Sequence, residues 1–219
     1  MQINHSNNHS TNFKAIKVAT THNTVGRVVT NIDLYKLEKS DKRFLETLKS
    51  KVNIKKLFPK LDTLSLERWQ HLFEYCVNTF VDSFDDINIT YLAIKDNHPC
   101  GILTYTDKGS EYYLDGICSI PIEINKKENY VGQTLFLQFF KDFYNNNIKK
   151  ATLSAVNDGP FNVVDKYKNL GFVKDMTTYP YSKMVCNKYK AKEQIANLSE
   201  HIKYKEVESK KVNLANILD

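Results

Sequence analysis

Hydrophobic and polar positions change their period along residues 112–172, and the change predicts strand, loop, helix, strand and helix in that order. Residues 112–119 form an aromatic and aliphatic run that stops at Pro121, which cannot donate to a sheet ladder. Beyond Gly132 the apolar residues recur instead at helical spacing, at Leu135, Phe136, Phe139, Phe140 and Phe143. A helix therefore begins near Gly132 and buries one face against a sheet.

The start of this helix has the properties of an anion site. Helix N-termini carry unpaired backbone N–H groups and a partial positive charge, and a glycine there lets a ligand approach the main chain. Lys126 and Lys127 lie just upstream and would add attraction. The segment therefore predicts a site for a phosphate-bearing ligand.

Three motifs follow one another in this region. Lys127-Glu128-Asn129-Tyr130-Val131-Gly132 stands at the helix start, a strand over residues 151–156 ends in Asn157, and a short helix leads to Tyr167-Lys168-Asn169-Leu170-Gly171-Phe172. Together they resemble the GCN5-related N-acetyltransferases, the GNAT superfamily. That family's pyrophosphate loop reads Arg/Gln-x-x-Gly-x-Gly/Ala, and a later signature reads Tyr-Glu-Lys-Leu-Gly-Phe. In this chain Lys127 replaces Arg or Gln, and Tyr130 replaces the first glycine.

The resemblance covers about residues 89–186 and implies an α+β fold of three layers. We expect a mixed, mostly antiparallel central sheet flanked by helices, with a helical N-terminal region and an extra C-terminal helix. One domain is expected over residues 13–189, after a disordered tail at residues 1–12. Residues 190–219 are expected to form a helix and tail, because apolar residues keep helical spacing at Ile195, Leu198 and Ile202.

The N-terminal third is expected to begin with two short strands, residues 13–19 and 25–31, around a connection at residues 20–24. Asp33 is expected to cap a helix. A second helix is expected from a Ser65 cap, with an amphipathic stripe at Leu66, Trp69, Phe73, Cys76, Val77 and Phe80. The resemblance implies that these helices wall the acceptor pocket.

Composition argues against several functional classes. No apolar run approaches the ~20 residues that cross a bilayer, and residues 1–12 lack the apolar stretch of a secretory signal. Four widely spaced cysteines indicate buried free thiols in a reducing compartment, so a cytoplasmic protein is expected. Six scattered histidines show no metal-ligand spacing, and hydrolase signatures are absent from the sequence. The net charge of +6 comes without a recognised nucleic-acid module, so we expect no nucleic-acid partner.

The resemblance implies transfer of an acyl group, most often acetyl, from acetyl-CoA to an amine by direct attack. Tyr167 occupies the place of the family's general acid, and a phenol with a pKa of ~10 is protonated at neutral pH. Its alternative role is packing near Leu170 and Phe172. For the general base we select Asp115, because burial in an apolar strand raises a carboxyl pKa. Glu111 or a water is the alternative base, and a structural role for Asp115 is left open.

The resemblance also assigns residues to the cofactor. Alternation is expected to place Tyr113, Asp115 and Ile117 on one face of their strand, and the main chain of residues 118–120 is expected to polarise the thioester carbonyl. The amide of Asn157 would bond to the pantetheine arm or cap its own loop. The full cofactor set is Ile117, Cys118, Ser119, Ile120, Lys127, Asn129, Tyr130, Val131, Gly132, Gln133 and Asn157.

Two alternatives belong to other functional classes. Because Tyr130 can screen a backbone N–H, the chain can instead be a catalytically inactive GNAT-fold module that binds CoA or a protein. It can also be a basic adaptor whose N-terminal helices bind a macromolecule. The acceptor stays open among small amines, amino acids, antibiotics, peptide N-termini and protein lysines, with aromatic candidates for its pocket at Tyr112, Tyr113, Tyr179 and Tyr181. A homodimer is left open as well.

Overall fold

One large sheet collects strands from the whole length of the chain. The computed structural model describes residues 14–25, 28–83, 87–121, 123–126, 128–159, 162–214 and 217. Its strands are β1 (Ala15–Val25), β2 (Val28–Lys36), β3 (Asn88–Lys95), β4 (His98–Asp107), β5 (Glu111–Ser119), β6 (Lys150–Val156), β7 (Val173–Thr178), β8 (Tyr181–Asn187) and β9 (Ile202–Val212). Its helices are η1 (Lys39–Asp41), α1 (Lys42–Lys51), α2 (Ile54–Leu57), α3 (Thr63–Val81), α4 (Val131–Asn145), α5 (Val164–Asn169) and α6 (Lys188–Ser199).

The strand order is β7-β8-β6-β5-β4-β3-β2-β1-β9. Within this order the described pairs are antiparallel except for β5–β6, which is parallel. The expected α+β fold with a mixed, mostly antiparallel sheet is therefore confirmed.

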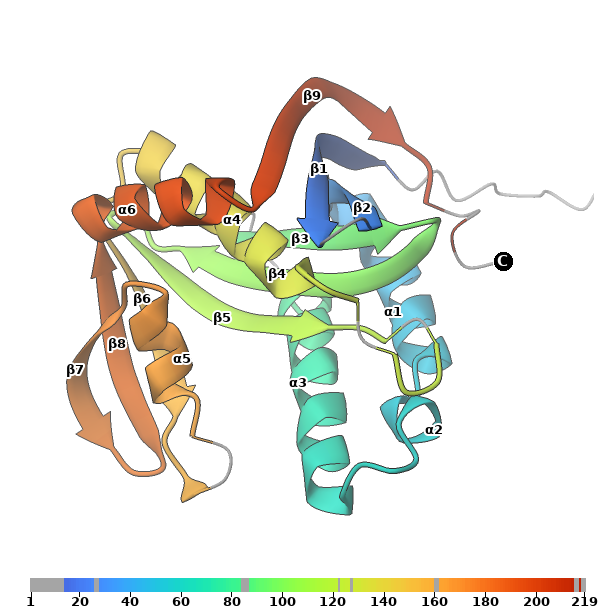
Figure 1. Cartoon of the computed structure of the whole chain (residues 1–219), viewed down its shortest axis with the longest axis horizontal. Coiled ribbons are helices and arrows are strands. Elements are labelled where there is room, and N and C mark those ends of the chain that lie inside the picture. Colours follow the sequence, from blue (N-terminus) through green and yellow to red (C-terminus); the bar gives the residue numbers. More distant parts are fainter. Residues whose placement is uncertain are drawn as a thin grey trace, which may run out of the picture.

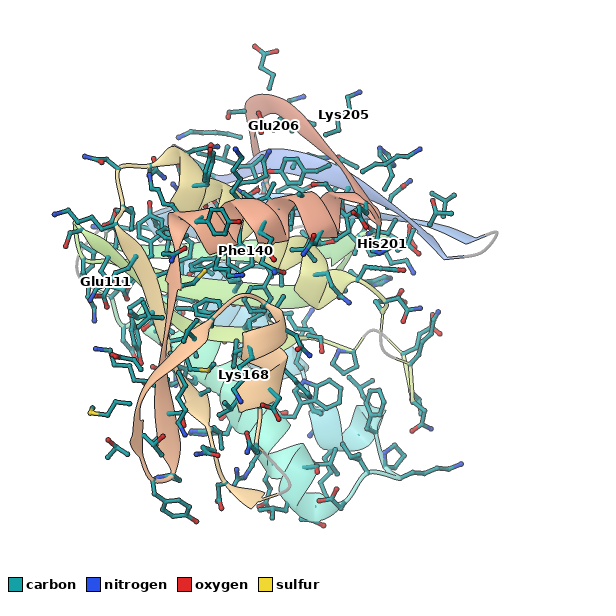
Figure 2. All side chains as sticks on the ribbon, turned by 60° about the vertical axis from the view of Figure 1, so that its left-hand side comes forward. Glu111, Phe140, Lys168, His201, Lys205 and Glu206 are labelled. Carbon is teal, nitrogen blue, oxygen red and sulfur yellow. The ribbon has the colours of Figure 1, made fainter. Side chains whose placement is uncertain are left out.

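Helices cover both faces of the sheet (Figure 1). α4 and α6 lie on one face and α1, α2 and α3 on the other. The α4 layer is strongly aromatic, since Phe139 lies 5.2 Å from Tyr105 and 5.6 Å from Phe140 between ring centroids. Figure 2 shows Phe140 inside this layer, beneath α6. The stripe of phenylalanines in the sequence thus fixes α4 against the sheet, as its spacing predicts.

The first two described strands form a β-hairpin that is longer than the two short strands expected. β1 runs unbroken through residues 20–24, so the connection expected there is wrong. Asp33 lies inside β2 and not at a helix cap, and its carboxylate pairs with the Lys17 ammonium at 2.7 Å. Every second residue of this segment is buried, at Thr30, Ile32 and Leu34, and this spacing is that of a strand and not of a helix.

The α3 helix confirms the expected amphipathic stripe but begins earlier than Ser65. Its N-cap is Asp62, whose Oδ1 accepts the Ser65 backbone N–H at 2.8 Å. An aspartate three residues ahead of a serine therefore provides the cap that was assigned to the serine.

The C-terminal region is also partly β-structure. α6 ends at Ser199, and Ile202 begins β9, which pairs with β1 and forms one edge of the sheet. The helix expected to continue past residue 199 is therefore wrong. Ile195, Leu198 and Ile202 keep a helical spacing, but a set this short also fits a helix followed by a strand.

Several other expectations can be compared directly. All four cysteines are free and buried, as expected. In the described ranges we find no helix that is both long and apolar enough to cross a membrane. The tail expected at residues 1–12 lies outside the described residues.

Candidate active site

The sheet opens into a wedge between β5 and β6. These strands pair only over residues 111–114 and 150–153. Beyond that point they diverge, with β5 passing over α3 and β6 continuing beside β8 (Figure 1). We call this opening the wedge. Each strand keeps a neighbour on its outer side, so the backbone edges that face each other across the wedge have no strand partner in the described structure.

Only alternate residues of β5 turn their main chain toward the wedge. The Ile120 N–H donates to the Cys100 carbonyl of β4 at 2.8 Å, so the main chain of Ile120 is directed away from the wedge. Because this direction alternates along a strand, Cys118 shares it, whereas Ile117 and Ser119 face the wedge. The Ser119 carbonyl already accepts the Trp69 indole N–H of α3 at 2.8 Å. The expectation that residues 118–120 act together is corrected: their main chains point in alternate directions.

A β-bulge changes which β5 side chains share a face. Thr104 pairs with Gly116 and Tyr105 with Leu114, so Asp115 is an extra residue in the ladder. The expected grouping of Asp115 with Ile117 is therefore wrong: Ile117 packs in the α4 layer together with Leu114. An inserted residue reverses the alternation that follows it.

After the bulge, Gly116 faces α3. A Cβ atom on Gly116 would lie 2.6 Å from the Cys76 Sγ, too close for any side chain. The glycine thus lets α3 pack directly on β5 and brings Cys76 beside the wedge.

Asp115 lies on the α3 side of the wedge in an environment that favours its neutral form. The Thr106 hydroxyl donates to its Oδ2 at 2.7 Å. Burial raises the pKa of Asp115 to about 6, although the Thr106 hydrogen bond and the Lys108 charge lower it. This pKa suits a group that accepts a proton near neutral pH. Thr106 was not identified from the sequence. The only sequence feature that could have indicated it is its place two residues beyond Thr104 on β4.

Glu111 is placed differently. It lies at the closed end of the wedge, where its carboxylate pairs with the Lys150 ammonium at 2.9 Å. Burial raises the pKa of Glu111, but the hydrogen bonds from Lys150 and Thr152 outweigh it and leave the pKa lowered. The geometry therefore favours Asp115 over Glu111 as a base.

Tyr167 reaches the wedge from α5. Its ring packs edge-on against Phe136 at 6.2 Å and against Phe172 at 6.0 Å between centroids. Burial and the nearby Cys76 thiol raise the pKa of Tyr167 to about 12, so the phenol is protonated at neutral pH. Among the described residues its hydroxyl has no hydrogen-bond partner. The packing role is real, and it leaves the hydroxyl free to donate.

Cys76 connects the two candidate groups in space. Burial, the Cys118 thiol and the Asp115 carboxylate all raise the pKa of Cys76. Since the same thiol influences Tyr167, Asp115 and Tyr167 approach the wedge near one point of α3. Because its raised pKa keeps the Cys76 thiol neutral, it adds no charge beside these groups.

The first turn of α4 presents the free main-chain groups that the expected anion site requires. Its first intrahelical hydrogen bond is the Thr134 N–H to the Tyr130 carbonyl at 2.8 Å. The N–H groups of Val131, Gly132 and Gln133 have no acceptor among the residues that the structure describes. A Cβ on Gly132 would meet nothing within 4 Å, so a ligand has open access to these amides. The helix tip can therefore bind an anion through its main chain.

Tyr130 adopts the backbone conformation of the glycine that it replaces. It is the N-cap of α4, with φ 63° and ψ 2° in the left-handed region. A side chain in this region costs about 1 kcal/mol relative to glycine. The loop thus keeps a path that favours glycine, despite the substitution.

Ion pairs hold the loop that leads into α4. The Lys95 ammonium of the β3–β4 hairpin lies 2.5 Å from the Glu128 carboxylate, whose side chain is only 7% exposed. Lys126 pairs with Glu123 at 3.2 Å and with Glu128 at 3.7 Å. The charge of Lys126, expected to attract phosphate, is thus largely balanced by acids. Lys127 lies outside the described residues.

We predict that Lys95→Met weakens binding of a ligand to the α4 tip about tenfold, because it leaves the buried Glu128 carboxylate without its nearest partner. Lys126→Met is the matched control. Its pair with Glu128 is longer and half-exposed, so affinity should change less than about threefold. Calorimetric titration of both variants with CoA measures the difference. Equal affinities in the two variants would show that the Lys95 pair does not position the loop.

Comparison with known proteins adds information only at the level of structure. No family model and no curated protein matches the sequence. Among solved structures, the PaiA N-acetyltransferase of Thermoplasma acidophilum in complex with coenzyme A aligns with a TM-score of 0.50 and 20% identity, covering 71% of this chain and 98% of that chain. FdhC, a nucleotide-linked sugar GNAT in its apo form, aligns with a TM-score of 0.52 and 15% identity, covering 87% and 97%. The ribosomal-protein-S18-alanine N-acetyltransferase of Escherichia coli aligns with a TM-score of 0.50 and 13% identity, covering 71% and 93%.

The chain has the GNAT fold. The resemblance read from three short motifs is therefore supported by the backbone over 71–87% of the chain. In the GNAT fold of this chain the candidate groups come from separate elements that meet at one opening: Asp115 on β5, Tyr167 on α5 and the amides at the start of α4.

The far side of the wedge holds the remaining predicted residues. The Asn157 side-chain Oδ1 accepts the Asn162 amide at 3.0 Å, so part of this side chain closes its own loop, as the alternative role predicts. Asp158 links the segment that contains Tyr179 to α3 at the wedge. Its carboxylate accepts a hydrogen bond from the Tyr179 hydroxyl at 2.9 Å and pairs with Arg68 of α3 at 3.4 Å.

The four tyrosines suggested for the acceptor pocket lie in three different settings. Tyr112 is buried in the α4 layer and accepts the Asn146 amide at 2.9 Å, so its assignment to a pocket is wrong. Tyr179 and Tyr181 are more than half exposed. The Tyr113 hydroxyl bonds to Ser154 of β6 at 3.1 Å, across the start of the wedge.

Proposed function

We propose that this protein is an acyl-CoA-dependent N-acyltransferase that moves an acetyl group from acetyl-CoA to an amine by direct attack. The observation that carries the proposal is the α4 tip, where three backbone N–H groups without acceptors among the described residues stand beside a wedge with unpaired strand edges. A diphosphate requires donors of this kind, and an extended amide-bearing arm requires free strand edges.

The described residues fit such a cosubstrate. Val131, Gly132 and Gln133 would donate to the pyrophosphate. The main chain of Ile117 and the N–H of Ser119, whose carbonyl accepts from Trp69, would meet the arm inside the wedge. Gly101 supports this arrangement, because a Cβ there would lie 2.3 Å from Val131 and push the α4 tip away from β4. Acetyl-CoA supplies the acetyl group as a thioester. The PaiA structure with coenzyme A supports the choice at the level of fold.

The proton transfers are assigned to two side chains. Asp115 would accept a proton, directly or through a water, from the attacking amine on the α3 side of the wedge. Tyr167 would donate its phenolic proton as negative charge develops on the departing sulfur, because its raised pKa keeps that proton at neutral pH. A covalent role for Cys118 is disfavoured, since its side chain is buried in the layer beneath α3.

The acceptor is proposed to be a small-molecule or peptide amine. It would enter on the α3 side, past Arg68, Asp158 and Tyr179 at the mouth of the wedge. The inner limit would be the ring of Tyr75 on α3, whose Cδ1 lies 3.6 Å from a Cβ built on Gly116. PaiA and the ribosomal-protein acetyltransferase are both N-acetyltransferases by name, which supports an amine rather than a hydroxyl acceptor. A cytoplasmic location is kept as a prediction from the buried free thiols.

The test of the proposal has two stages. Calorimetric titration with acetyl-CoA should give one saturable site, and release of CoA thiol should then depend on an added amine. Failure to bind acetyl-CoA rejects both the enzyme and the CoA-binding module. Binding without thiol release across a panel of small amines, peptides and protein lysines favours the inactive module, for which the strained Tyr130 is the supporting observation.

The Asp115 assignment predicts a pH dependence. Only the carboxylate accepts a proton, so kcat/KM should rise with pH and level off above about 6, the raised pKa of Asp115. Asp115→Asn should remove this limb and lower kcat/KM about 100-fold. Asp165→Asn, at an exposed position on α5, is the control and should keep the wild-type profile. A wild-type profile in Asp115→Asn would reject Asp115 as the base and return the role to Glu111 or a water.

A further inference from the structure

A basic cavity of about 570 Å³ lies at the end of the sheet formed by β1, β2, β3 and β9. None of the residues assigned above to the wedge or to the α4 tip lines it. β1 and β3 begin at this end, whereas β2 and β9 finish there. Antiparallel pairing therefore gathers four chain segments that are far apart in the sequence.

Five of the residues that line the cavity are lysines: Lys14, Lys36, Lys39, Lys42 and Lys211. Among the described lining residues the one carboxylate is that of Glu38. Glu38 pairs with Lys211 at 3.1 Å, which still leaves an excess of four positive charges on the described lining. Charges of one sign around a hollow raise the local concentration of counter-ions.

The fold holds these lysines in place. Lys36 and Lys211 both stand opposite Ile16, one on each side of β1, so the register directs them to the same face. The Lys42 ammonium donates to the carbonyl groups of Val81 and Ser83, at 2.7 and 2.5 Å, at the end of α3. Lysines that only keep a surface soluble would not need to be held in fixed positions.

The rest of the lining is mixed. Leu37, Phe80 and Ile89 provide apolar surface, and Ser40 and Asn88 provide neutral hydrogen-bonding groups. The volume lies within the range of about 300–1,000 Å³ that is typical of small-molecule sites.

We propose that this cavity binds a small molecule that carries several phosphate groups, at a site separate from the acyl-transfer wedge. Lysine ammonium groups are suited to phosphate oxygens as point charges. The inference rests on the cavity alone and is independent of the acyltransferase proposal.

Calorimetric titration of the full chain with inorganic tripolyphosphate and with ATP tests the proposal. The titrations are made with and without saturating CoA, because the α4 tip is itself an anion site. We expect one saturable site that CoA does not remove and that weakens as salt rises. The two probes distinguish a bare polyphosphate from one attached to an organic group, and tight binding of either supports the site.

The double substitution Lys14→Glu/Lys36→Glu should weaken this binding at least about tenfold, because two attractions become repulsions. Lys205→Glu is the matched control. Lys205 is an exposed lysine of β9 that does not line the cavity and stands at the outer bend of the strand (Figure 2). It should bind like the wild type, and circular dichroism confirms that each variant is folded.

Three results would overturn the proposal: no saturable binding of either probe, complete loss of binding when CoA is present, or equal weakening in the double variant and in Lys205→Glu. If CoA itself fails to bind, the acyltransferase proposal falls. The double variant then still decides the question of the cavity, because it differs from the wild type only there.

Discussion

Tyr167→Phe should lower the turnover number about 100-fold or more while leaving the affinity for acetyl-CoA unchanged. Loss of a general acid typically costs this much. The substitution removes one hydroxyl that has no partner among the described residues, and it retains the ring that packs on Phe136 and Phe172. The loss should therefore appear in kcat and not in binding. Single-turnover kinetics and calorimetry measure the two quantities separately.

Tyr112→Phe is the matched control for this prediction. Tyr112 is a buried tyrosine of the same aromatic layer, and its hydroxyl bonds to Asn146 away from the wedge. We expect a small loss of thermal stability and wild-type turnover. A Tyr167→Phe enzyme with wild-type turnover would reject the proton-donor role and leave Tyr167 as a packing residue only.

Gly132→Asp should raise the Kd for acetyl-CoA at least about 100-fold without unfolding the protein. Two unit charges about 4 Å apart near a protein surface repel by about 4 kcal/mol, and 100-fold requires only about 2.8 kcal/mol. The helix itself tolerates the change, because an acid in the first turn favours the helix dipole by about 0.3–1 kcal/mol. A Cβ at this position meets nothing within 4 Å, so there is room for the side chain.

Gly132→Ala separates charge from size. Its methyl group enters the same open space without a charge, so the affinity for acetyl-CoA should fall far less than in Gly132→Asp. Thermal melting of both variants, followed by titration with acetyl-CoA, provides the comparison. Similar affinities for the two variants would mean that no phosphate lies at the α4 tip.

The parts of the fold that were predictable from sequence are those with a long, regular signal. The phenylalanine stripe after Gly132 and the amphipathic run ending at Phe80 both predicted helices that the structure confirms. Apolar runs bounded by Pro121 and by Asn157 predicted β5 and β6 to within a residue. These elements converge on the wedge, which explains why the fold was identified from its centre outward.

The errors have a common physical origin in short or interrupted patterns. The spacing of Ile195, Leu198 and Ile202 fits both one long helix and a helix followed by a strand. Only the pairing of β9 with β1 decides between the two. The extra residue at Asp115 is invisible to an alternation argument, because a bulge is defined by the partner strand and not by its own sequence. The left-handed Tyr130 is equally hidden, since nothing in its side chain favours that conformation.

The site itself was predicted as a set of residues rather than as a geometry. Tyr167 and Asp115 were selected from motif position and chemistry. Both are influenced by Cys76, which lies beside β5 because Gly116 permits close contact between α3 and β5. Trp69 was assigned only to a hydrophobic stripe, although its indole N–H also occupies the Ser119 carbonyl. Contacts of this kind require the tertiary fold.

The pairing of β9 with β1 joins the last described strand to the first described strand. During synthesis on the ribosome, β1 must therefore wait until β9 has been made before its outer edge is covered. A nonsense mutation shortly before Ile202 would release a product whose first hairpin exposes an open row of amide and carbonyl groups, a template for intermolecular aggregation. The closing strand, with its many lysines and glutamates, presents a charged border in its place.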